Sequence, residues 1–145
     1  MDLEEVFNVR MPVCLLIVLA SAGCGGGNGY YPVSGKVLHD GAPAVGAVVY
    51  FCRQGEIDRL HEHVPQGVVG DDGTFTLASP AGAGALPGAY AVLIEWKKGA
   101  GELRGRGPGL ASPDRFQGRY MDPNNPVFQA EVKAEKNQLP PFELR

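Results

Sequence analysis

The residues best suited to hold a metal ion lie together in His61-Glu62-His63. On an extended backbone the side chains at positions i and i+2 project to one side, a spacing that lets two imidazoles bind zinc or copper. A third ligand is then needed, and His39 and Asp58 are the candidates. The alternative is a solvated loop that carries two histidines and no metal, because a pair of ligands is a weak metal pattern.

A second chemical feature is a run of positive charge around residues 98–113, a segment rich in glycine and proline that is predicted to be a mobile loop. Grouped cations of this kind can dock an anionic surface such as phosphate headgroups or an acidic polysaccharide. The alternative is a solvated loop that binds nothing. The cations of the loop are Lys98, Arg104 and Arg106, and the run continues in Lys97, Arg115 and Arg119.

Motifs for covalent catalysis are not found in the sequence. No serine lies in a Gly-x-Ser-x-Gly elbow, and no His-x-x-Glu pattern resembles a carboxypeptidase zinc site. Cys52 follows Phe51 at the end of an apolar stretch, where a half-buried structural thiol is favoured over a nucleophile. We therefore expect a protein that is not an enzyme and that needs no cofactor.

Length and composition limit the architecture. A chain of 145 residues with 44% apolar residues fits one globular domain plus a leader. The content of 21 glycines and 12 prolines indicates many turns between short strands and little helix. The formal charge of −3 provides no net basic field to attract a polyanion, so we expect no nucleic-acid partner.

The elements that must position these side chains are predicted to be strands, because apolar residues alternate with a period of two. Residues 89–97 show the longest alternation and predict a central strand with Tyr90, Val92, Ile94 and Trp96 on one face. Shorter runs predict strands at 33–37, 47–51 and 128–132. Trp96, Tyr50 and Tyr90 could stack on sugar rings if exposed, but their register favours packing in the core.

Turn residues separate these runs. Asp40-Gly41 predicts a turn between the first two strands, and the second strand is expected to start after Pro43, which cannot donate to a ladder. Asp71-Asp72-Gly73 predicts a hairpin with Phe75 on a buried face. Two prolines within residues 139–144 confine the last strand to an edge. About seven short strands at this spacing predict an all-β, antiparallel β-sandwich.

An apolar run at residues 11–20 precedes the small residues Ser21-Ala22-Gly23 and then Cys24. The run is too short for a bilayer span, which needs about 20 apolar residues, and fits the core of a secretory signal. The Ala-Gly-Cys ending resembles the lipobox of bacterial lipoproteins, although Ser21 stands at a usually apolar position and residues 1–10 are acidic. This resemblance implies lipidation of Cys24 and cleavage before it. An ordinary secretory signal, or an uncleaved hydrophobic N-terminus, is the alternative.

The order of the turn and strand motifs resembles the carboxypeptidase-regulatory-like, or transthyretin-like, domains, and more narrowly the small single-domain lipoproteins of planctomycete-type bacteria. This resemblance implies a prealbumin-like sandwich and a module without catalytic residues. The Tyr-Arg-Gly-Ser sequence of the transthyretin-like hydroxyisourate hydrolases is absent. The motifs are Gly35-Lys36-Val37, Asp40-Gly41-Ala42-Pro43, residues 46–51, Asp72-Gly73-Thr74-Phe75, residues 87–92 and residues 137–144.

Together these observations predict a signal peptide at 1–23, a flexible glycine-rich tether at 24–30 and one β-sandwich domain at 31–145. We expect a lipid-anchored module of the bacterial cell envelope, facing the periplasm or the cell surface, with a structural or binding role. The membrane would be reached through the N-terminal lipid, and an envelope protein or a polysaccharide is the expected partner. A carbohydrate- or metal-binding surface protein and a degenerate relative of the hydrolases are the alternatives.

Overall fold

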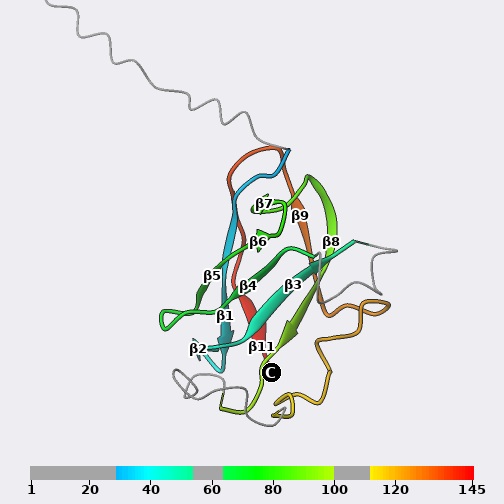
Figure 1. Ribbon diagram of the computed structural model, residues 1–145. Helices are drawn as coiled ribbons and strands as arrows, with labels where there is room; N and C mark the ends of the chain where they lie inside the picture. The colour runs from blue at the N-terminus through cyan, green and yellow to red at the C-terminus, as the bar shows by residue number, and fades with distance from the viewer. Residues whose placement is uncertain (1–28, 54–63, 100–111) are drawn as a thin grey trace, which may run out of the picture.

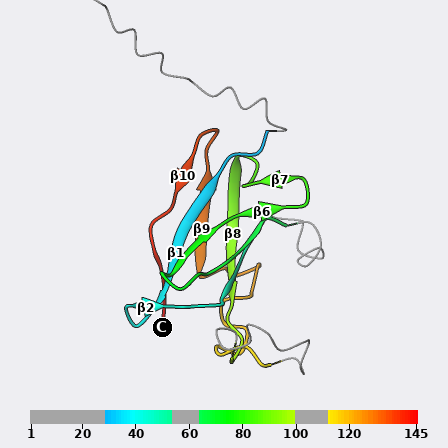
Figure 2. The ribbon, with the colours of Figure 1, turned by 60° about the vertical axis from the view of Figure 1, so that its left-hand side comes forward.

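The computed structural model describes residues 29–53, 64–99 and 112–145, and these residues are all-β. Their strands form two sheets that face each other across a common core (Figures 1 and 2). No helix occurs within the three described ranges. The strands are β1 (Val33–His39), β2 (Ala42–Pro43), β3 (Val48–Cys52), β4 (Gln66–Val68), β5 (Thr74–Thr76), β6 (Ala78–Ser79), β7 (Gly82–Ala83), β8 (Gly88–Glu95), β9 (Phe128–Val132), β10 (Asn137–Gln138) and β11 (Phe142–Leu144).

The first sheet is built around β1. On one edge of β1, β5 and β2 run antiparallel to it. On the other edge, β10 and β11 run parallel to it. Pro140 and Pro141 separate β10 from β11, because proline has no N–H to donate to a ladder. The last segment therefore lies at an edge as predicted, but the prediction of a wholly antiparallel sandwich was wrong at these two pairings.

The second sheet has the strand order β7-β6-β4-β3-β8-β9 and is antiparallel throughout. The long strand β8 lies between β3 and β9, as its extended alternation predicted. In Figure 1, β3 crosses the middle of the molecule, β8 curves down its right-hand side, and β9 lies next to β8.

The turn at Asp40-Gly41 forms as predicted, with φ values of 51° and 79° at the two residues. The prediction that the next strand begins after Pro43 was wrong. Leu38 pairs with Pro43 in β2, and the following amide, that of Ala44, donates to the Val37 carbonyl oxygen at 3.1 Å. The chain then crosses to the second sheet as β3, so the two long strands on either side of this turn belong to different sheets.

The turn at residues 70–74 also takes the chain from one sheet to the other. The Gly70 amide donates to the Thr74 carbonyl oxygen at 2.8 Å, and the Asp72 carboxylate accepts the Thr74 hydroxyl at 2.6 Å and the Thr74 amide at 3.0 Å. These hydrogen bonds from Thr74 lower the pKa of the Asp72 carboxyl. The flanking strands then diverge, β4 to β3 and β5 to β1, so the predicted hairpin is a corner between the sheets.

The core between the sheets contains the faces that the alternation predicted. Ala47, Val49 and Phe51 of the second strand run are fully buried there. Trp96 and Tyr90 are 8% and 5% exposed, which confirms that they pack in the core. The other face of β3 is buried as well, in a second cluster of Tyr50, Cys52, Val64 and Leu93.

The described part of the chain begins at one end of the sandwich, which we call the proximal end. There Tyr31 and Ala85 exchange two hydrogen bonds, Tyr31 N–H to Ala85 O at 2.9 Å and Ala85 N–H to Tyr31 O at 3.0 Å. The turn between β9 and β10 lies at the same end, and β1 runs from it to β2 and the C-terminal strand at the opposite end (Figures 1 and 2). Gly84 fits against this bridge only because it lacks a side chain, since a Cβ atom would lie 1.8 Å from the Tyr31 carbonyl oxygen.

Candidate functional site

Most of the predicted site residues fall outside the described ranges. Cys24, His61, His63, Arg104 and Arg106 are among them, as is Asp58, so lipidation and metal binding stay predictions. Within the described ranges no group of three or more His, Cys, Asp or Glu side chains could hold a metal ion. Lys98 is described, and it is exposed just beyond the end of β8.

His39, the suggested third metal ligand, lies at the end of β1 among aromatic rings. Its imidazole packs edge-on against Trp96 and Phe116, with ring centroids 5.6 and 5.4 Å away. Its Nε2 atom is 3.5 Å from a carboxylate oxygen of Asp40. These contacts give His39 a packing role at the end of the core.

The chain just after β8 and the turn segment at 112–121 lie at the end of the sandwich opposite the proximal end (Figure 1). They carry Lys97, Lys98, Arg115 and Arg119, and we call these four residues the basic end. They come from two segments, the residues just after β8 and the turn segment at 112–121. Main-chain pairing holds the segments together, with a bridge between Lys97 and Asp114 and a hydrogen bond from Lys98 N–H to Pro113 O at 3.2 Å. The pairing brings together cations that are 17 or more positions apart in the sequence.

The carboxylate of Asp114 fixes the turn segment to β8. Its Oδ1 accepts the Trp96 amide at 2.8 Å, and its Oδ2 accepts the amides of Phe116 at 3.2 Å and Gly118 at 2.8 Å. Both carboxylate oxygens are therefore occupied by main-chain N–H groups, which a short acidic side chain at the start of a turn commonly binds. The Asp114 carboxylate therefore serves to fix the turn segment to β8.

Arg115 stacks on the only tryptophan of the chain, with its guanidinium carbon 4.2 Å from the ring centroid of Trp96. The Arg115 amide also donates to the Trp96 carbonyl oxygen at 2.8 Å. Trp96 is itself held in place, because its indole N–H donates to the Val45 carbonyl oxygen at 2.9 Å. A guanidinium on an aromatic face gains both cation–π attraction and a defined orientation.

Arg119 lies on the other side of this segment, near the end of β11. Its guanidinium carbon is 5.6 Å from the Tyr120 ring centroid, and its NH1 donates to the main-chain oxygen of Arg145 at 3.1 Å. The Tyr120 hydroxyl donates to the same oxygen and accepts the Arg145 amide, both at 2.8 Å. The turn segment therefore binds β8 on one side and the C-terminal strand on the other.

The sequence had indicated part of this site. Grouping by charge had included Arg115 and Arg119 with the loop, but it did not find the stack on Trp96 or the anchoring role of Asp114. The sequence did contain one local signal for the anchoring role of Asp114. Gly118 follows Asp114 four residues later, a composition typical of a turn closed by an Asp side chain.

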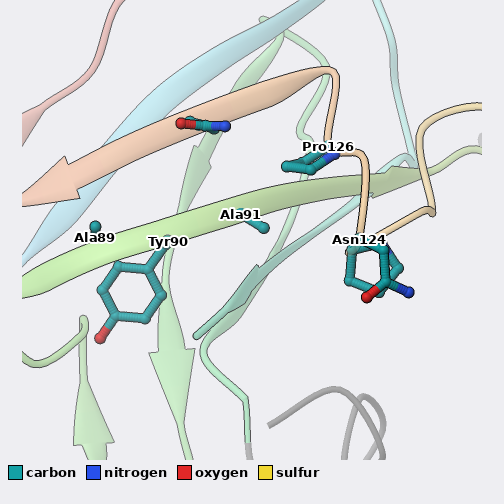
Figure 3. A pocket seen from close by; sticks show the side chains of 7 residues that line it. Ala89, Tyr90, Ala91, Asn124 and Pro126 are labelled. Atoms are coloured by element: carbon teal, nitrogen blue, oxygen red, sulfur yellow. The ribbon is translucent and has the colours of Figure 1, made fainter. Parts of the chain in front are cut away.

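A groove of about 340 Å³ lies elsewhere, over the start of β8 and the loop before β9 (Figure 3). Its polar lining comes from the amide side chains of Asn124 and Gln129. The hydroxyl of Tyr90, a further lining residue, donates to the Leu86 carbonyl oxygen at 2.8 Å and accepts from Arg53 at 3.1 Å. The other lining residues are Ala89, Ala91, Pro123 and Pro126, so the groove has neutral walls.

A wider hollow of about 580 Å³ covers the outer face of β3, β4 and β6. Val68 is 65% exposed on it, and Tyr50 lies at its base. Burial, together with the nearby carboxylate of Glu95, raises the pKa of the Tyr50 hydroxyl above 10.0. The hollow is mostly apolar, and its lining includes Val48, Gly67, Ala78 and Pro80.

The fold and these sites define an all-β, sandwich-like protein with a basic end held by aromatic stacking. Comparisons with protein families, with curated proteins and with solved structures found no match. In the described part of the chain, no helix has the length and apolar character needed to cross a membrane.

Proposed function

We propose that this protein is a non-catalytic module of the bacterial cell envelope, attached to a membrane by lipid on Cys24. Its sandwich is of the prealbumin-like type, as in the carboxypeptidase-regulatory-like and transthyretin-like domains. Residues 24–30 are a tether, because a glycine-rich chain behaves as a flexible coil. The folded domain has a structural or binding role on the far side of this tether.

The observation that supports the proposal best is where the described domain begins. Tyr31 is fixed by its two hydrogen bonds with Ala85 at the proximal end, seven positions after Cys24. A strand rises about 3.3 Å per residue, so β1 alone extends about 23 Å away from this point. A lipid on Cys24 would hold the proximal end near the membrane and leave the basic end pointing outward.

The energetics of a lipid anchor agree with this arrangement. Each buried methylene contributes about 0.8 kcal/mol, and attachment becomes stable when two or more acyl chains are present. The protein would then be anchored to the membrane without spanning it.

Mass spectrometry of the mature N-terminus tests the anchor. We expect a product that starts at Cys24 and carries acyl chains, and that enters the detergent phase on phase separation. Cys24→Ser should abolish the lipid and move the protein to the aqueous phase. Cys14→Ser is the matched control, because Cys14 lies in the predicted leader and should have no effect. A mature chain that still contains residues 11–23 and needs no detergent would contradict the proposal.

A further inference from the structure

The basic end differs in charge from the rest of the protein. The chain has a formal charge of −3, yet residues 96–99 and 112–121 contain four cations and one carboxylate, that of Asp114. That carboxylate faces main-chain amides, as described above. A compact group of cations on an otherwise acidic protein attracts a polyanion to one place and orients it there.

The acidic residues around the basic end are also engaged with neighbours. Glu95 lies 3.6 Å from the ammonium of Lys97 and forms a hydrogen bond with Tyr50. Asp40 lies beside His39. Among the described residues, Lys97 has a carboxylate neighbour in Glu95, while Arg115 and Arg119 contact aromatic rings and Arg119 also donates to the main-chain oxygen of Arg145.

The contacts of Arg115 orient its guanidinium in a way that suits the binding of an anion. Stacking occupies the face of its guanidinium, and the N–H donors of a guanidinium lie in the plane of the group, where they match a carboxylate in two parallel hydrogen bonds. The side chain is exposed, and the hydrogen bond of its amide to Trp96 fixes its backbone. Binding to a side chain that is already oriented costs less conformational entropy.

We propose that the basic end binds an acidic polysaccharide through the carboxylates of successive sugar units. A polymer with repeated carboxylates can contact several of the exposed cations at once, which raises its affinity over that of a single anion. A membrane surface fits less well, because the basic end lies opposite the proximal end. This choice of polymer over membrane rests on the anchor of the proposed function, whereas the binding of carboxylates rests on the basic end alone.

Affinity electrophoresis of the full-length protein, purified in mild detergent, tests the proposal with polygalacturonate in the gel and neutral dextran as the reference polymer. We expect retardation by polygalacturonate only, and loss of retardation as NaCl is added, because exposed charges are screened. Trp96 is the only tryptophan, so its fluorescence should change when polygalacturonate binds beside it.

Charge-matched double variants locate the site. Lys98→Gln with Arg115→Gln should weaken binding roughly tenfold, the order expected for removing two exposed ion pairs. Lys133→Gln with Lys136→Gln removes the same charge near the proximal end and should leave binding unchanged. Arg115→Lys keeps the charge without the planar fork and should bind between wild type and the first double variant. Thermal unfolding of each variant checks that it is folded.

Equal weakening by both double variants would overturn the proposal, because it would show a general effect of charge. So would retention on vesicles containing phosphatidylglycerol without any retardation by polygalacturonate, which would identify a membrane surface. Failure of the anchor is seen separately in the mass of the mature N-terminus, which does not depend on any of these binding measurements.

Discussion

The guanidinium of Arg115 lies 4.2 Å from the centroid of the Trp96 ring, while the amide of Arg115 donates to the carbonyl oxygen of Trp96 at 2.8 Å. Two residues 19 positions apart are thus joined through both side chain and main chain. Asp114 holds the pair together by accepting the Trp96 amide. The order of the basic end therefore depends on a buried core residue and on one carboxylate.

Asp114→Asn should destabilise the protein by about 1–2 kcal/mol, the range for a side chain that caps main-chain amides. An amide has a single acceptor oxygen, so it cannot bind the Trp96, Phe116 and Gly118 amides together. Urea unfolding followed by Trp96 fluorescence measures the change.

Asp122→Asn is the control for this prediction. Asp122 uses only its Oδ1, which accepts the amides of Asn124 at 2.9 Å and Asn125 at 3.3 Å. The oxygen of an asparagine side chain can replace that acceptor, so stability should change by less than about 0.5 kcal/mol. If the two variants were equally stable, the anchoring role of Asp114 would be wrong.

Gly84→Ala should lower the free energy of unfolding by about 3 kcal/mol or more. The new Cβ atom would lie 1.8 Å from the Tyr31 carbonyl oxygen, at a residue whose φ is +92°. Gly41→Ala is the matched control, because Gly41 has a φ of +79° and no heavy atom within 4 Å of the added Cβ. Gly41→Ala should show only the backbone cost of about 1–2 kcal/mol. Similar thermal unfolding midpoints for the two variants would contradict the close approach of Tyr31.

Asn137→Ala should destabilise the protein by about 1–2 kcal/mol, because it leaves partly buried main-chain groups without partners. The Asn137 side-chain amide donates to the carbonyl oxygens of Glu135 at 2.6 Å and Lys133 at 3.1 Å, and its Oδ1 accepts the Lys133 amide at 2.9 Å. The neighbouring Gln138 is exposed, and Gln138→Ala should change stability by less than about 0.5 kcal/mol. Chemical denaturation of both variants gives the comparison, and equal losses would exclude a special role for Asn137.

Tyr50 should ionise at higher pH than an ordinary tyrosine, since burial first and the carboxylate of Glu95 second raise its pKa above 10.0. The folded state then keeps the phenolic proton more firmly than the unfolded state does. This contribution to stability is fully present below pH 10 and is lost as the pH rises through the folded pKa.

Spectrophotometric titration of the phenolate band tests this assignment. Tyr50→Phe should remove a component that titrates above 10.0. Glu95→Gln should lower the pKa of Tyr50 but leave it above 10.0, because burial is the larger cause. A pKa for Tyr50 at or below the ordinary tyrosine value in the wild type would contradict its burial.

The alternation of residue types predicted which side chains are buried, but it did not predict which strands pair. Val49 and Phe51 lie on the inner face of β3, and Val92 and Ile94 lie on the inner face of β8, as their spacing indicated. A period of two places side chains on alternate faces in parallel and antiparallel strands alike. For this reason the sequence did not reveal that β10 and β11 run parallel to β1.

At the turns too, the sequence predicted the local backbone conformation but not the sheet that the next strand joins. Asp40-Gly41 was predicted from its two residues, since a positive φ is a local property that glycine and aspartate tolerate. The sheet that the chain enters next depends on which apolar faces remain to be covered, and that is settled by contacts between distant residues. Pro43 pairs with Leu38 near the C-terminal end of β1. Proline has no N–H, and this position in the ladder does not require one.

By itself, the sequence determined the all-β class, the buried faces of the long strands and the positions of the turns, because these follow from side-chain periodicity and local backbone preference. It also indicated the grouping of cations near residue 98. Only the tertiary structure decided that Arg115 stacks on Trp96, that Asp114 accepts hydrogen bonds from main-chain amides, and that the basic end lies opposite Tyr31. Those relationships arise from long-range pairing between segments, and no local pattern encodes such pairing.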